Sequence, residues 1–165
     1  MRVTRVVGLG MAGIVVIAAV IALWSVRPQP VLGPRRSLTS EDIQAIESTI
    51  GLKVPGPETI DKIALLHGKD CSLFIKICVP AECGAAMRGV VSARARAVKH
   101  SDVLWSRVIP WFSLAEEKMD VAYEEALGDY TVFEKPFAGT TTIYICVGGI
   151  SKRIGPGVYR IFTGK

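Results

Sequence analysis

The sequence has few of the residues and motifs that would identify an enzyme. Its 165 residues include only two histidines and four cysteines, and their spacing does not form a compact zinc motif. It contains no glycine-rich phosphate loop and no nucleophile elbow of the Gly-x-Ser-x-Gly type. No internal repeat is visible either. We therefore expect no metal ion and no cofactor.

Charge is missing from one long stretch near the N-terminus. No charged residue occurs from Val6 to Val26, and most residues there are Val, Ile, Ala, Gly and Leu. About 20 apolar residues suffice to cross a bilayer core. Trp24 stands near the far end of the run, where interfacial aromatic residues are common. Residues 1–26 are therefore predicted to be a single membrane anchor.

The charges that flank this run predict its orientation. Arg2 and Arg5 precede it, which favours a cytoplasmic N-terminus and an exported C-terminal body. We expect a single-pass protein of the inner (cytoplasmic) membrane whose domain lies in the periplasm. The alternative is a cleaved signal peptide with a small-residue site at Val20-Ile21-Ala22, and that alternative also exports the body.

A short linker and one domain follow the run. Residues 27–37 are proline-rich and should be extended and semi-rigid. Residues 38–165 are enough for one modest hydrophobic core. Eighteen of the twenty basic residues and all fifteen acidic residues lie beyond the apolar run, so the body carries a net charge of about +3. This excess is too small to indicate nucleic acid as a partner.

Disulfides persist in exported domains, so the four cysteines of this domain can form disulfides with one another. Residues 71–78 (CSLFIKIC) read as a strand buried on both faces. Cys71 and Cys78 are seven positions apart, an odd spacing, so their side chains should point to opposite faces and cannot bond to each other. Cys78 with Cys83 is the plausible local pair, and pairings that involve Cys71 or Cys146 remain open.

The remaining pattern predicts alternating helices and strands. Helices are expected from Ser40 to about Ile50, from Pro80 to about Lys99, and from Pro110 to the stop at Gly128. Besides the strand that ends at Cys78, strands are expected at 103–109 and 140–147, with further extended segments at 151–154 and 158–162. Residues 59–66 read as a short helix or an irregular lead-in. This alternation predicts an α/β layer with some parallel pairing.

Three segments carry a resemblance to a known family. They are HGKDCSLFIKICVPAECGAAM (67–87), SDVLWSRVIPWFSLAEEKMDVAYEEAL (101–127) and GTTTIYICVGGISKRIGPG (139–157). Their order resembles the thioredoxin-like superfamily, in its membrane-anchored periplasmic thiol–disulfide oxidoreductase form. The resemblance implies a central sheet flanked by helices.

The resemblance also implies site residues. Cys83 matches the second cysteine of the family's Cys-x-x-Cys, Pro80 holds the position of the first, and Cys78 is the nearest replacement. Cys78 and Cys83 would be the catalytic pair, and Thr140 falls at the position of the family's cis-proline. The implied function is thiol–disulfide exchange, or redox-linked maturation, with protein thiols and disulfides of exported or membrane proteins as partners.

Three alternatives stay open at this stage. The first is a redox-inactive thioredoxin-like binding or assembly module of a membrane complex, in which Cys78 and Cys83 form a structural disulfide. The second is a sortase-like site with Cys146 as nucleophile, Arg160, and His67 or His100 as base. The third alternative is the role of a basic cluster formed by Arg88, Arg94, Arg96 and Lys99. The cluster is either a solvated helix face or a surface that contacts anionic lipid or an acidic helix.

Overall fold

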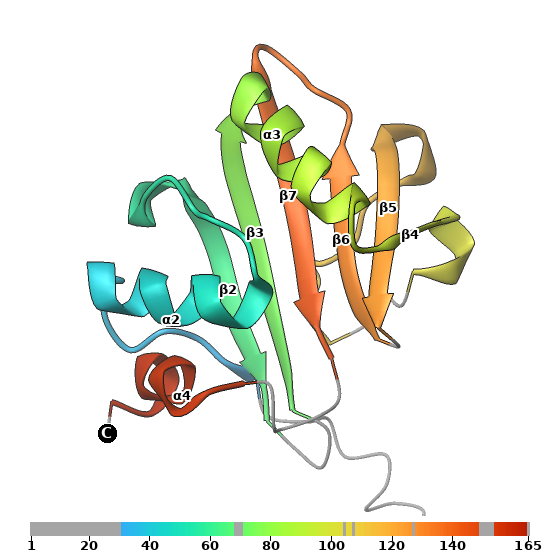
Figure 1. Cartoon of the computed structure of the whole chain (residues 1–165). Helices are drawn as coiled ribbons and strands as arrows, with labels where there is room; N and C mark the ends of the chain where they lie inside the picture. The colour runs from blue at the N-terminus through green and yellow to red at the C-terminus, as the bar shows by residue number, and fades with distance from the viewer. Residues whose placement is uncertain are drawn as a thin grey trace, which may run out of the picture.

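The chain forms one antiparallel sheet with helices on one of its faces (Figure 1). A computed structural model describes residues 31–67, 71–103, 105–106, 108–126, 128–148 and 154–164. The strands are β1 (Val31–Leu32), β2 (Ile60–Leu66), β3 (Ser72–Pro80), β4 (Arg96–Val98), β5 (Met119–Ala126), β6 (Asp129–Glu134) and β7 (Thr140–Val147), in the spatial order β1-β2-β3-β7-β6-β5-β4. The helices are α2 (Ser40–Ile50), α3 (Ala81–Ser92) and α4 (Pro156–Thr163).

The predicted thioredoxin-like α/β fold is wrong. All six pairs of neighbouring strands in this sheet run antiparallel, whereas the prediction required parallel pairing across helical crossovers. The reason lies between residues 110 and 147. Because β5, β6 and β7 follow one another as a meander, no helix is available there to return the chain for a parallel strand.

The predicted membrane segment belongs to a part of the chain that the structure does not describe. The expected anchor at 1–26 and the first linker residues lie outside the described residues. Among the helices that are described, none is both long enough and apolar enough to cross a bilayer. The later linker residues contact the domain: β1 pairs with Leu65 and Leu66, and the Arg35 N–H donates to the Ile161 carbonyl at 3.2 Å.

The first helix begins and ends close to its predicted bounds. Thr39 is the N-cap residue of α2, and it forms a reciprocal capping box with Asp42. The Thr39 N–H donates to Asp42 Oδ2 at 2.8 Å. Gly51 ends the helix with φ 66°, the left-handed conformation that favours glycine. The helix predicted at 40–50 is thus confirmed, with its N-cap one residue earlier than the sequence suggested.

The middle of the chain differs most from prediction. The helix predicted from Pro80 to Lys99 ends at Ser92, and β4 follows. The strand predicted at 103–109 does not form in its described residues. The helix predicted from Pro110 is wrong, because a single 3-10 turn at 116–118 leads directly into β5.

Of the predictions for the remaining elements, some are confirmed and others are wrong. The strands predicted at 71–78 and 140–147 are confirmed as β3 and β7, the two central neighbours of the sheet. Residues 59–66 form β2 rather than a helix. The extended segment predicted at 158–162 is wrong, since these residues lie in α4, which begins at Pro156 and ends at Gly164 (φ 70°).

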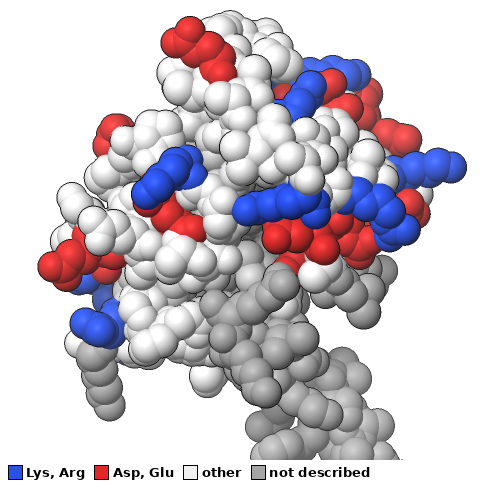
Figure 2. All heavy atoms as spheres, in the orientation of Figure 1, with Lys and Arg blue, Asp and Glu red and all other residues white. Residues whose placement is uncertain are grey.

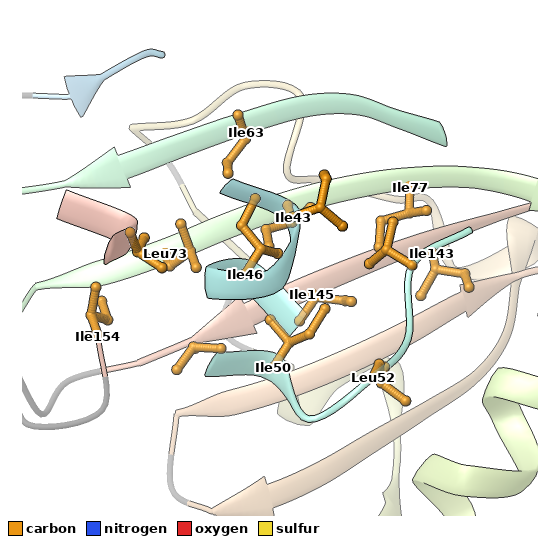
Figure 3. Packing of buried hydrophobic residues seen from close by; sticks show 14 of the residues in the cluster. Ile43, Ile46, Ile50, Leu52, Ile63, Leu73, Ile77, Ile143, Ile145 and Ile154 are labelled. Atoms are coloured by element: carbon orange, nitrogen blue, oxygen red, sulfur yellow. The ribbon is translucent and has the colours of Figure 1, made fainter. Parts of the chain in front are cut away.

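Each face of the sheet carries its own buried cluster. The helical face collects side chains of α2, α3, α4 and alternate residues of β2, β3 and β7, several of which Figure 3 labels. The opposite face, called the second face below, is covered by aromatic and aliphatic residues of segment 103–114. There the Phe74 and Phe112 rings meet edge-to-face at 4.9 Å. β3 alternates between the two clusters, with Leu73, Ile75, Ile77 and Val79 on the helical face.

Candidate functional site

All four cysteines are free thiols in this structure. Cys71 lies in the helical-face cluster and Cys146 in the second-face cluster, and both are buried. Burial raises the pKa of Cys146 to about 12. Cys78 and Cys83 are half-buried. Thiol chemistry at near-neutral pH is therefore confined to the latter two.

The two half-buried cysteines lie on opposite sides of the sheet. Cys78 Sγ is 4.0 Å from Thr142 Oγ1 on the second face. Cys83 packs against the helical-face cluster from α3. The structure therefore does not bring the predicted catalytic pair together. The predicted opposition of Cys71 and Cys78 is confirmed, because Cys71 belongs to the helical face.

Thr140 lies beside the turn from β3 to α3. It pairs with Pro80 across the two central strands, and the next N–H, that of Ala81, donates to the Gly139 carbonyl at 2.9 Å. Since Cys78 pairs with Thr142, both Cys78 and Thr140 lie on the second face. No cis peptide bond occurs among the described residues.

A groove opens on the second face next to these residues. It has a volume of about 650 Å³ and is called the distal groove below; its lining residues are Glu117, Lys118, Glu134, Lys135, Pro136, Phe137, Ala138, Thr140 and Thr142. Of the three predicted site residues, Thr140 lines the groove. Cys78 is not a lining residue, but its Sγ lies 4.0 Å from the hydroxyl of Thr142, which lines the groove.

Phe137 stands out of this groove on a rigid support. Its side chain is 84% exposed, although it is a large apolar residue. Phe137 and Thr140 exchange backbone hydrogen bonds of 2.9 and 3.0 Å around a two-residue turn. Both turn residues have positive φ, 49° for Ala138 and 78° for Gly139, as the tight turns of β-hairpins require.

Lys135 fixes the same hairpin to the segment before β5. Its N–H donates to the Lys118 carbonyl at 2.8 Å, and its Nζ donates to the Glu117 carbonyl at 2.7 Å. Sequence reasoning missed Phe137 and Lys135. The available signal was Gly139 immediately before the β-branched run of β7, which marks a hairpin turn.

An ion pair lies two residues before Cys78. Lys76 Nζ is 2.9 Å from Asp61 Oδ2, and this hydrogen bond raises the pKa of Lys76. A β-bulge between Ile60 and Lys62 makes this contact available. Lys62 is opposite Lys76 in the register. Burial also raises the pKa of Tyr144, whose ring lies 5.8 Å from Lys76 Nζ.

The residues of the sortase-like alternative do not form a site. Cys146 is buried on the second face, whereas Arg160 belongs to α4 on the helical face. His100 Nε2 is 2.6 Å from the Leu114 carbonyl oxygen, and its ring lies against Trp105. His67 is exposed beyond the end of β2. The structure therefore gives Cys146 no base or cation from this set.

The basic cluster meets acidic residues rather than open solvent alone. Arg88 pairs with Asp120, Arg94 with Glu125 at 3.1 Å, and Arg96 with Glu124 at 2.5 Å. The acidic partners lie on β5, which is a strand and not the predicted helix. In Figure 2 basic and acidic side chains intermingle on the side of the molecule where β4 and β5 lie. Each of these three arginines thus has an acidic partner on β5.

Within the described ranges, no group of three or more His, Cys, Asp or Glu side chains is arranged to hold a metal ion. Comparisons with known proteins identified no match: no family model, no curated protein and no solved structure is similar to this chain. The candidate site consequently rests on geometry alone.

Proposed function

We propose that this chain is a membrane-anchored binding module that assembles with a partner protein through the distal groove. The observation that carries the proposal is Phe137, an aromatic side chain that is 84% exposed on a hairpin fixed at both ends. Exposed, preorganised aromatic residues are the common anchors of protein interfaces. A solitary exposed Phe adds nothing to the stability of the chain itself.

The position of the groove supports this proposal. β1, the first described element, pairs with the last two residues of β2, at the end of the sheet where β3 begins. The groove lies at the other end, where β3 ends at Pro80. Nine residues of β3 span about 26 Å at the usual rise per residue. An N-terminal anchor would thus leave the groove on the part of the domain that faces away from the membrane (Figure 1).

The border of the groove has the composition of an interface. Pro136, Phe137 and Ala138 form an apolar centre, and charges of both signs surround it: Glu117, Lys118, Glu134 and Lys135. An apolar centre with a polar rim is the usual anatomy of a protein–protein contact.

The test replaces Phe137 by Ala in the full chain and follows the size of the assembly that contains it. Membranes of cells that make the protein are solubilised, and the chain is detected on a native gradient. We expect the variant to migrate as the free chain, because loss of an aromatic anchor weakens an interface by about 2 kcal/mol or more, roughly 30-fold. Val90→Ala is the matched control, since Val90 is 51% exposed on α3, away from the groove. Equal migration of wild type and Phe137→Ala would contradict the proposal.

Thiol–disulfide exchange is the second candidate, and it is favoured by the half-buried Cys78, which contacts Thr142 of the groove. The Cys78 thiolate would attack a partner disulfide, form a mixed disulfide and release the other partner sulfur as a thiolate; a second thiol of the partner would then release Cys78. Oxidised glutathione is the probe. One glutathione should add to the wild type and none to Cys78→Ser. An adduct on Cys83, or no adduct, would oppose this function.

A further inference from the structure

Within the described residues, the outer edge of β2 is only partly covered. β1 pairs with Leu65 and Leu66, and no other strand of the described chain pairs with the outer edge of β2 at 60–64. The chain leaves this edge after Leu32, and the Arg35 N–H already bonds to α4. Five residues of β2 thus present an edge about 16 Å long at strand geometry.

A cavity of about 480 Å³ follows this open edge. We call it the edge slot; its lining residues are Pro34, Arg36, Ser37, Leu38, Pro57, Ile60, Asp61, Lys62, Ile63 and Trp111. Leu38 packs against the helical-face cluster, whereas Trp111 packs against the second-face cluster. The slot therefore has one wall on each side of the sheet plane, with a β2 edge between them.

We propose that the edge slot takes an extended segment of a partner protein, which adds to the sheet as a strand beside β2. Strand addition supplies affinity through backbone hydrogen bonds and specificity through alternate side chains. The β1–β2 pairing already uses the same edge in this way. A partner segment would continue along the line that β1 leaves, so the new interface is continuous with an existing one. This surface is separate from the distal groove, and its test does not depend on the groove.

The two walls specify the chemistry of the segment. Ile63 faces the helical side with Leu38, while Lys62 is exposed and follows the opposite alternation. The other two charged residues of the slot already have partners, since Arg36 pairs with Asp42 and Asp61 pairs with Lys76. Lys62 is therefore the charge that a partner segment would meet. An alternating segment would therefore place apolar β-branched residues toward Leu38 and acidic residues toward Lys62.

A second copy of this chain is a poor occupant. Residues opposite each other in an antiparallel pair share a face, so two copies of β2 related by a two-fold axis pair about a central residue. The pairing that uses all of 60–64 is centred on Lys62 and places Lys62 opposite its own copy. Like charges directly opposite are destabilising, and an edge lysine is a known protection against such pairing.

The experiment uses the full chain in detergent micelles and a fluorescent peptide with the sequence Glu-Val-Glu-Val-Glu-Val. The control peptide, Glu-Glu-Glu-Val-Val-Val, has the same composition without alternation. Fluorescence anisotropy should show saturable binding of the alternating peptide only. Lys62→Glu should weaken this binding at least tenfold, whereas Lys99→Glu, a charge reversal at the exposed end of β4, should leave it unchanged.

N-methylation distinguishes strand addition from contact by side chains. Methyl groups on the peptide nitrogens that face β2 should abolish binding, and methyl groups on the opposite set should not. Equal binding of the two methylated peptides, or of the control peptide, would overturn the proposal. Slow exchange, without peptide, of those amides of 60–64 that point away from β3 would also overturn it, because the outer edge would then already be occupied by the chain itself.

Discussion

Gly84 of α3 lies directly against Thr141 of β7, so that a Cβ at position 84 would come within 2.8 Å of the Thr141 Cβ. Thr141 is 4% exposed and has little room to move. This contact sets how closely α3 approaches the centre of the sheet.

Gly84→Ala should therefore destabilise the protein although alanine favours helices. Overpacking costs about 1–3 kcal/mol, and the gain in helix propensity offsets at most about 1 kcal/mol. Gly89→Ala is the matched control in the same helix, since no atom lies within 4 Å of a Cβ there. This control should gain about 0.5–1 kcal/mol. Urea unfolding of both variants measures the difference, and similar midpoints would show that α3 can shift.

The turn below Phe137 stores strain at Ala138. Its φ of 49° is left-handed, which costs a non-glycine residue about 1–2 kcal/mol. Ala138→Asn should raise the free energy of unfolding by about 0.5–1 kcal/mol, because asparagine tolerates this conformation. Gly139→Ala should lower it, since Gly139 has φ 78°. Denaturant midpoints check both signs; a destabilised Ala138→Asn variant would contradict the turn geometry.

Arg94 connects the end of α3 to the end of α2. Its guanidinium donates to the Ile50 and Gly51 carbonyls at 2.8 Å each and pairs with Glu125. Arg94→Ala should cost about 1 kcal/mol or slightly more, because the last carbonyls of α2 lose charged donors. Arg96→Ala should have almost no effect, since that side chain is 76% exposed. Thermal unfolding of the two variants provides the comparison.

Asp42 should make the protein sensitive to acid. Burial raises its pKa, but hydrogen bonds from Arg36 and Thr39 outweigh burial and hold the pKa below the usual 3.8. A carboxyl whose pKa is lower in the folded state than in the unfolded state stabilises the fold at pH values above its unfolded-state pKa. This contribution disappears as the pH falls through the folded-state pKa. Asp42→Asn should be less stable at neutral pH and lose less stability from about pH 5 to about pH 2. Glu41→Gln, on the exposed side of the same turn, should follow the wild type.

The half-buried thiols should alkylate before the buried ones. Cys78 and Cys83 should therefore react with iodoacetamide before Cys146. With a pKa of about 12, only about one Cys146 thiol in ten thousand is ionised at pH 8. Mild oxidation should leave the folded chain without an intramolecular Cys78–Cys83 disulfide, because the sheet separates them. Mass spectrometry of digested, alkylated protein follows both results, and a disulfide between these residues would refute the placement.

Local signals in the sequence predicted α2, β3 and β7 well. The acidic first turn after Ser40 and the glycine at 51 mark helix ends by local chemistry alone. The strands at 71–78 and 140–147 are continuous β-branched or apolar runs, which suit central positions buried on both faces.

The errors occurred where periodicity was ambiguous. Phe112, Ala115, Met119, Tyr123 and Ala126 fit a helical stripe, yet β5 alternates in pairing with β6 and contributes Ala122 to one cluster and Tyr123 to the other. Tertiary pairing overrides propensity in such segments. Hydrophobic periodicity identifies residues that are buried in a core, so it does not identify Phe137, which is exposed. Likewise, Cys78 and Cys83 were close in sequence, but a strand-to-helix turn carried the second to the other side of the sheet.

The central pairing of β3 with β7 has a consequence for how the chain acquires its structure. The β2–β3 hairpin and the β5–β6–β7 meander can each form from neighbouring residues, but β3 and β7 pair residues that are 60 to 74 positions apart. The two halves therefore join late, through the β3–β7 pairing alone. Closure of the long loop between these two strands should limit the folding rate. Until β7 has been synthesised and has left the ribosome, β3 presents an unpaired apolar edge. The interval before closure is the time when this protein most needs protection from aggregation.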